Sequence, residues 1–124
     1  MIILESHLPW PPSVNHYWKQ GIKFINGKRI TTRYKSPKAC KFIADVKKII
    51  GKTDLSISRV GVEIIAFMPD KRIRDIDNLA KGVLDSLVAA RLILDDSQID
   101  DLRIIRGDVV KGGMIKIKVW EILQ

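Results

Sequence analysis

The pattern of hydrophobic and polar positions predicts six strands. Runs rich in β-branched and aromatic residues fall at 2–8, in a hairpin over 22–34, and at 59–67, 102–110 and 114–122. Asn26-Gly27 in the hairpin is a strong signal for a two-residue turn. In the last run, Ile115, Ile117 and Val119 alternate with polar residues, which is typical of a strand with one buried face.

Helical spacing of apolar residues predicts two helices. The first begins with Ser36 as N-cap and Pro37 at the first helical position, and Gly51 ends it. The second is expected to start near 75–78 and to run to about Arg91. The order β-ββ-α-β-α-ββ predicts an α+β fold with two helices packed on a mixed, mostly antiparallel sheet.

Length and composition indicate one globular domain over residues 1–124, with 46% hydrophobic and 29% charged residues. The single cysteine, Cys40, cannot form an intrachain disulfide and is expected to pack on the first helix, which favours a reducing, cytoplasmic setting. No apolar run is long enough for a membrane helix, and the first residues lack the features of a signal peptide.

Charge is distributed unevenly along the chain, which has a net charge of +8. Residues 70–101 hold eight of the fourteen acidic residues and net −3, whereas the rest of the chain nets +11. A basic domain favours a polyanionic partner, but an aspartate patch would repel phosphate. A divalent cation between carboxylates and phosphate resolves that conflict.

Asp75 and Asp77 lie at the predicted transition from strand to helix, where two carboxylates could converge on one ion. Lys81 follows Asp77 by four residues and could neutralise charge on a phosphate oxygen. Asp96 could join the pair only if the chain doubles back after the helix. Taken one at a time, ordinary explanations compete: an N-cap at Asp75 or Asp77, a polar turn at Asp96, and an ion pair of Lys81 with Asp77 or Asp85.

Three separated motifs, in order and in register, resemble the RusA family of Holliday junction resolvases. They are Leu8-Pro9-Trp10-Pro11-Pro12-Ser13-x-Asn15, then Met68-Pro69-Asp70-x-Arg72-x-Arg74-Asp75-x-Asp77-Asn78-Leu79-x-Lys81, and Leu94-Asp95-Asp96-x-Gln98. Lys111-Gly112-Gly113 also fits the C-terminal hairpin of that family. The resemblance covers nearly the whole chain.

This resemblance implies a homodimeric, Mg²⁺-dependent endonuclease that nicks opposing strands of a four-way DNA junction, in a family often carried by phages and prophages. By matched position, Asp75, Asp77 and Asp96 would hold one or two Mg²⁺ ions, for which Mn²⁺ could substitute, and Lys81 would be the motif lysine. Lys71, Arg72 and Arg74 are expected to position the DNA backbone. Their basic run is interrupted by Ile73, and no nucleotide cofactor is expected.

Two other functions remain open from the residues alone: a non-catalytic junction- or DNA-binding module, and a metal-dependent ribonuclease with the same ligands. Asn15, Tyr17 and Trp18 could line the DNA face, although core packing is an equal alternative for the aromatic pair. The roles of Asp95, Asp100 and Asp101 stay undecided at this point.

Overall fold

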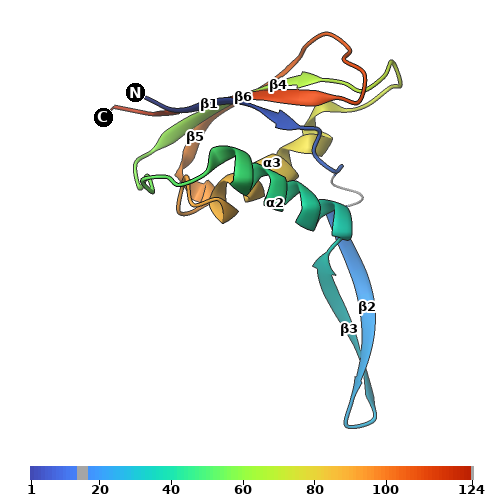
Figure 1. Ribbon diagram of the computed structural model, residues 1–124. Coiled ribbons are helices and arrows are strands. Elements are labelled where there is room, and N and C mark those ends of the chain that lie inside the picture. Colours follow the sequence, from blue (N-terminus) through green and yellow to red (C-terminus); the bar gives the residue numbers. More distant parts are fainter. Residues whose placement is uncertain (14–16, 124) are drawn as a thin grey trace.

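The computed structural model describes residues 1–13 and 17–123, and it confirms the predicted α+β architecture (Figure 1). A four-stranded sheet carries two helices on one face, and a separate hairpin projects from this body. The strands are β1 (Ile2–Pro9), β2 (Trp18–Ile25), β3 (Lys28–Lys35), β4 (Val60–Phe67), β5 (Ile99–Arg106) and β6 (Met114–Glu121). The helices are α2 (Pro37–Ile50) and α3 (Ala80–Ala89), with short 3₁₀ helices η1 (Ile76–Leu79) and η2 (Asp96–Gln98).

The sheet has the order β1-β6-β4-β5, in which only the β4–β5 pair is parallel. Alternate residues of β4 and β6 point toward the helices and form the core; among them, Ile64, Ile117 and Val119 are completely buried. From the helices, Phe42 and Leu87 complete this core. The lysines that alternate with Ile117 lie on the other face of the sheet, as the sequence pattern predicts.

Both helices form where the sequence predicts them. The Ser36 hydroxyl accepts a hydrogen bond from the Ala39 N–H at 3.1 Å, and Gly51 ends α2 with φ 71°. The second helix begins as the 3₁₀ turn η1 and continues as α3 until Arg91 adopts φ 60°. None of the helices described is long and apolar enough to cross a membrane.

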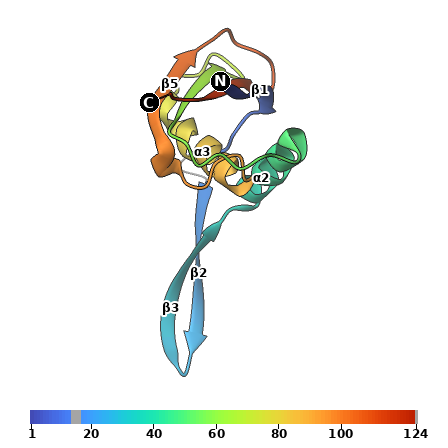
Figure 2. The same ribbon diagram turned by 90° about the vertical axis from the view of Figure 1, so that its left-hand side faces the viewer.

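The parallel pair β4–β5 is connected by η1, α3 and η2, so the chain runs along β4, back along α3, and forward again along β5. Parallel strands require such a crossover connection. The residues that follow β4 therefore lie at one end of the sheet, and the residues that precede β5 lie at the other (Figures 1 and 2). This arrangement separates two parts of the predicted site.

Three local predictions need correction. β5 begins at Ile99 rather than at the predicted residue 102, because cations neutralise Asp100 and Asp101 within the strand, and it ends at Arg106 rather than at 110. The hairpin strands are also longer than the predicted 22–34. Cys40 is exposed on α2 and does not pack in the core.

Candidate active site

Asp75 and Asp77 lie at the entry to the η1–α3 helix, as predicted. Asp75 occupies the N-cap position of η1, with φ −83° and ψ 133°, but its side chain accepts no capping hydrogen bond. The N-cap explanation is therefore correct for the position of Asp75 but does not account for its carboxylate, which makes no capping hydrogen bond. Both carboxylates are exposed, and neither takes part in an ion pair or hydrogen bond within the part of the chain that the structure describes. Two adjacent carboxylates thus remain available for a ligand.

The Asp96 carboxylate is also free to bind a ligand, because the neighbouring residue forms the cap of this turn. Its neighbour Asp95 caps η2 and accepts a hydrogen bond from the Ser97 N–H at 3.1 Å. Hydrogen bonds from Ser97 lower the pKa of Asp95. Gln98 closes this capping box from the other side. The polar turn therefore uses Asp95 and leaves the Asp96 carboxylate exposed to solvent.

The structure does not bring Asp96 to Asp75 within one chain. Arg59, just before β4, donates to the Ser97 carbonyl at 2.7 Å, which places Asp96 beside the start of the β4–β5 pair. Arg106, at the end of β5, donates to the Arg74 carbonyl at 2.7 Å, which places Asp75 beside the other end. Eight residues of β5 separate the two ends, so the carboxylates lie on the order of 20 Å apart.

The other aspartates of the acidic region have protein partners. Asp100 pairs with Arg59, and Asp101 pairs with Arg103 at 3.0 Å. The hydrogen bond from Arg59 lowers the pKa of Asp100. These ion pairs explain why acidic residues are tolerated inside the edge strand β5.

Asp70 organises the turn that carries the predicted DNA-positioning residues. Its carboxylate pairs with Arg74 and accepts a hydrogen bond from the Arg72 N–H at 2.9 Å. The Arg74 guanidinium, assisted by that N–H, holds the pKa of Asp70 at about 2. Arg74 is thereby largely neutralised. Arg72 also approaches Asp70, at 3.6 Å through its Nε atom, but its side chain stays mostly exposed, and Lys71 is exposed as well. These two residues are better placed to reach a phosphate.

Lys81 lies on the first turn of α3, and its ammonium contacts Asp85 at 3.2 Å. Of the two ion-pair partners considered for it, the structure selects Asp85. Asp85 is mostly buried and lies near Tyr17, whose ring is completely inaccessible to solvent. Burial, together with the negative charge of Asp85, raises the pKa of Tyr17. Tyr17 is thus a core residue, as one of its two sequence-based alternatives stated.

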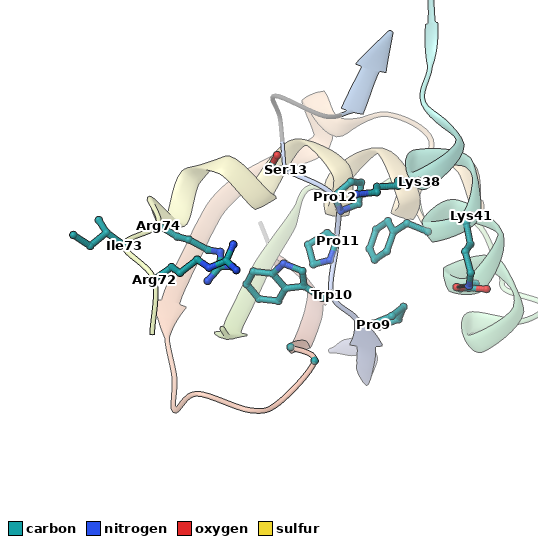
Figure 3. Close-up of a pocket in the computed structure, with 14 residues that line it drawn as sticks. Pro9, Trp10, Pro11, Pro12, Ser13, Lys38, Lys41, Arg72, Ile73 and Arg74 are labelled. Carbon is teal, nitrogen blue, oxygen red and sulfur yellow. Dashed lines mark hydrogen bonds and ion pairs between the residues drawn. The ribbon is translucent and has the colours of Figure 1, made fainter. Parts of the chain in front are cut away.

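A cationic groove lies beside this helix entry (Figure 3). It has a volume of about 780 Å³ and runs along the proline-rich segment 9–13, between α2 and the 72–74 turn. Lys38 and Lys41 line one side, where Lys41 is paired with Asp45 at 2.8 Å. Arg72 lines the other side, where it points toward the Trp10 indole. A smaller hollow of about 300 Å³ continues from the groove to Asp75. The groove and the hollow share Trp10, Pro11 and Arg74 in their walls, so Asp75 lies next to the cationic surface.

A contact of Trp10 connects the first motif, at residues 8–15, with the glycine turn at residues 111–113. The Trp10 indole lies against Gly113, where a Cβ atom would approach the ring to 2.9 Å. Gly113 also has φ 71°, a conformation that glycine adopts without strain. The glycine pair thus allows the 111–113 turn to support the wall of the groove. Asn15, from the first motif, lies outside the described residues, so its expected DNA contact stays a prediction.

The donor set at Asp75 and Asp77 suits a hard cation such as Mg²⁺. Such an ion favours oxygen ligands and commonly takes one or two carboxylates from a protein, completing its shell with water and substrate phosphate. Among residues 1–13 and 17–123, however, no three His, Cys, Asp or Glu side chains are grouped so that they could hold one metal ion. Asp75 and Asp77 are therefore two carboxylates that this end of the sheet offers to such an ion.

Sequence reasoning gave no role to two residues that position the site. Gln98 is buried and fixes the turn that carries Asp96, and only its place in the third motif drew attention to it. Arg106 anchors the backbone before Asp75, and it has no recognisable local signal because its partner is 32 residues away. A third feature, the strongly basic hairpin, could have been found by counting charges.

The structure is that of a small, basic α+β protein whose free carboxylates lie close to a cationic groove. These features are typical of a protein that acts on a polyanion. Comparison with known families agrees: residues 9–120 match the family model of the endodeoxyribonuclease RusA. A crossover junction endodeoxyribonuclease of Enterobacteria phage HK97 is 44% identical over 118 residues, covering 93% of this chain and 92% of the relative. The chain belongs to the RusA endodeoxyribonuclease family.

Further relatives carry the same name. The Escherichia coli K12 crossover junction endodeoxyribonuclease RusA is 35% identical over 117 residues, covering 92% of this chain and 91% of the relative. The corresponding protein of Enterobacteria phage 82 is 36% identical with the same coverage. The family resemblance seen in the sequence motifs is therefore confirmed over nearly the whole chain.

Proposed function

We propose that this protein is a crossover junction endodeoxyribonuclease that acts on four-way DNA junctions in the cytoplasm and requires Mg²⁺. Family membership supports the substrate class. The observation that carries the chemistry is the position of Asp75, which occupies a helix N-cap without capping and lines the hollow next to the cationic groove. Asp75 and Asp77 would hold the ion, which would supply Lewis-acid activation of water and of the scissile phosphate.

The surrounding residues position the substrate. Lys71 and Arg72 would bind backbone phosphates at the mouth of the groove, and such contacts place DNA without reading its sequence. Lys81, held by Asp85, offers a positive charge one helical turn beyond Asp77. That charge would stabilise the phosphate oxygens in the transition state more than in the bound substrate.

We further propose a two-fold symmetric homodimer in which Asp96 of the partner subunit completes each metal site. The argument is geometric: Asp96 lies at the opposite end of the β4–β5 pair from Asp75, yet all three carboxylates match the family motifs. A two-fold axis repeats the same contact twice, so one such dimer would contain two complete sites. Two sites could cut the two equivalent strands of a junction.

Complementation between inactive variants tests this arrangement. Asp75→Asn chains and Asp96→Asn chains should each fail to cleave, because a neutral amide is a poorer ligand for a hard cation. Mixed dimers of the two variants should regain one intact site, formed by Asp75 of one chain and the native Asp96 of the other. A supercoiled cruciform plasmid would report that single site as nicked circles rather than linear product.

The matched control mixes Asp75→Asn chains with Asp77→Asn chains, which should stay inactive because every site then contains one substitution. Inactivity of the first mixture, with mixed dimers demonstrated by mass, would refute the shared site. A protein that stays monomeric on the junction in ultracentrifugation would refute the dimer. Labelled junction, duplex and RNA assayed with Mg²⁺ would distinguish the resolvase from a ribonuclease or a non-catalytic binding module.

A further inference from the structure

The hairpin β2–β3 stands away from the rest of the molecule. Its strands pair with each other over eight residues each, and they do not join the four-stranded sheet. Figures 1 and 2 show it as an arm that leaves the body near the start of α2. A hydrogen bond from the Ser36 N–H to the Tyr17 carbonyl, at 2.8 Å, closes its base.

The outer half of this arm exposes apolar side chains. Ile22, Phe24 and Ile25 have exposed fractions of 53%, 72% and 52%. A two-stranded hairpin with no third strand or helix against it is marginally stable in water. Exposed apolar surface at the end of such an arm indicates that a partner covers it during function.

The charge of the arm identifies the chemistry of that partner. Residues 18–35 contain six basic side chains and no acidic ones: Lys19, Lys23, Lys28, Arg29, Arg33 and Lys35. In the observed register, residues directly opposite each other share a face, which assigns three of these cations to each face of the ribbon. Cations on both faces suit an element surrounded by negative charge, and they do not suit one that packs against a protein.

The arm continues the cationic surface of the groove. β3 leads through Ser36 into α2, whose first turns carry Lys38 and Lys41 on the wall of the groove. A two-stranded ribbon also has a suitable width to enter the major groove of B-form DNA. The arm is therefore placed to hold the same DNA molecule that crosses the candidate active site.

We propose that the β2–β3 hairpin is a DNA-binding arm that grips a duplex arm of the junction through its phosphates. This proposal rests on the proposed function. A second copy of the chain is a weaker candidate for the partner that covers the arm. Two arms in contact would each contribute six positive charges, and neither arm has an acidic residue to neutralise them.

The test compares two matched double variants. Lys23→Ala/Lys28→Ala removes two exposed lysines from one face of the arm, and Lys47→Ala/Lys48→Ala removes two exposed lysines from the last turn of α2. Junction affinity is measured across a salt series, together with the single-turnover cleavage rate at saturating enzyme and the mass of the free protein.

Each lost phosphate contact should reduce the slope of log affinity against log salt by about 0.9. The arm variant should therefore show a slope shallower by about two and weaker binding at low salt, with an unchanged saturated cleavage rate and an unchanged mass. The α2 variant should keep the slope of the native protein. Equal slopes for the arm variant and the native protein would overturn the proposal.

A loss of dimer mass in the arm variant would also overturn it, by assigning the arm to a second copy of the chain. Failure of the proposed function gives a different result, because the native protein would then neither bind junctions selectively nor cleave them. Cleavage by the native protein together with an unchanged slope in the arm variant would refute only the arm.

Discussion

Replacing Gln98 should destabilise the protein and damage its active site together. The side chain is only 8% exposed and forms four hydrogen bonds. Its carbonyl oxygen accepts from the N–H groups of Leu94 and Asp95, at 2.7 and 2.9 Å. Its amide donates to the carbonyl oxygens of Ser56 and Ser58, each at 2.9 Å. One side chain thus ties the turn that carries Asp96 to the segment before β4.

The magnitude follows from these contacts. A neutral hydrogen bond contributes about 0.5–1.5 kcal/mol net, and water can replace some of those at the exposed turn. Gln98→Ala should therefore reduce the free energy of unfolding by about 2–4 kcal/mol. A domain of this kind has about 5–15 kcal/mol in total, so the variant should still fold. Cleavage should fall by more than the loss of folded protein, because the turn loses its fixed position.

Gln98→Glu separates the two halves of the network. The carboxylate can still accept from both N–H groups, but it cannot donate to the two carbonyl oxygens it faces. Near neutral pH this variant should be destabilised at least as much as Gln98→Ala. The deficit should shrink in acid, where a protonated carboxyl regains one donor.

Denaturant unfolding measures both effects, with Gln20→Ala as the matched control because Gln20 is exposed on β2. The reasoning fails if Gln98→Ala unfolds within about 0.5 kcal/mol of the native protein, the range expected for an ordinary surface substitution. It also fails if Gln98→Glu loses the same stability at every pH.

Three further predictions test other parts of the molecule. Lys81→Ala should slow single-turnover cleavage more than it weakens junction binding; a native rate would leave only its surface ion pair. Asp70→Asn should lower the free energy of unfolding above pH 3.8, the ordinary pKa of the group, because Arg74 depresses the pKa of the native carboxyl. The difference in stability between variant and native protein should vanish in acid unfolding as the pH falls through about 2. Gly61→Ala should lower the free energy of unfolding by about 1–3 kcal/mol or more, because its Cβ would lie 2.2 Å from the Trp120 ring; an unchanged free energy of unfolding would show that the ring moves freely.

The features that could be predicted from the sequence are those with a local physical cause. Ser36 and Gly51 fix the ends of α2 through a hydroxyl acceptor and a positive φ, and both signals lie within a few residues of the structure they determine. The Asn26-Gly27 turn is equally local, with both residues at positive φ. Among the described residues, local rules therefore identified the six strands and the helices α2 and α3, although several boundaries moved and the short 3₁₀ helix η2 was not predicted.

The features that could not be predicted depend on distant partners. Asp100 is accommodated in β5 because Arg59 neutralises it from 41 residues away. The choice between two partners for Lys81 depends on side-chain packing around Asp85. The separation of Asp96 from Asp75 follows from the direction of the crossover connection, which residue spacing does not encode. The motif lists three aspartates as one group, but the fold divides them.

The place of β6 in the sheet has a consequence for how the protein is synthesised. This strand is the last of the fold in chain order, yet it lies between β1 and β4 and pairs with both. While the ribosome still holds residues 114–121, β1 has no partner, and the apolar faces of both helices lack half of the sheet that covers them. The nascent chain must therefore keep its core open until β6 has been synthesised, and truncation within β6 would prevent folding rather than merely shorten an edge.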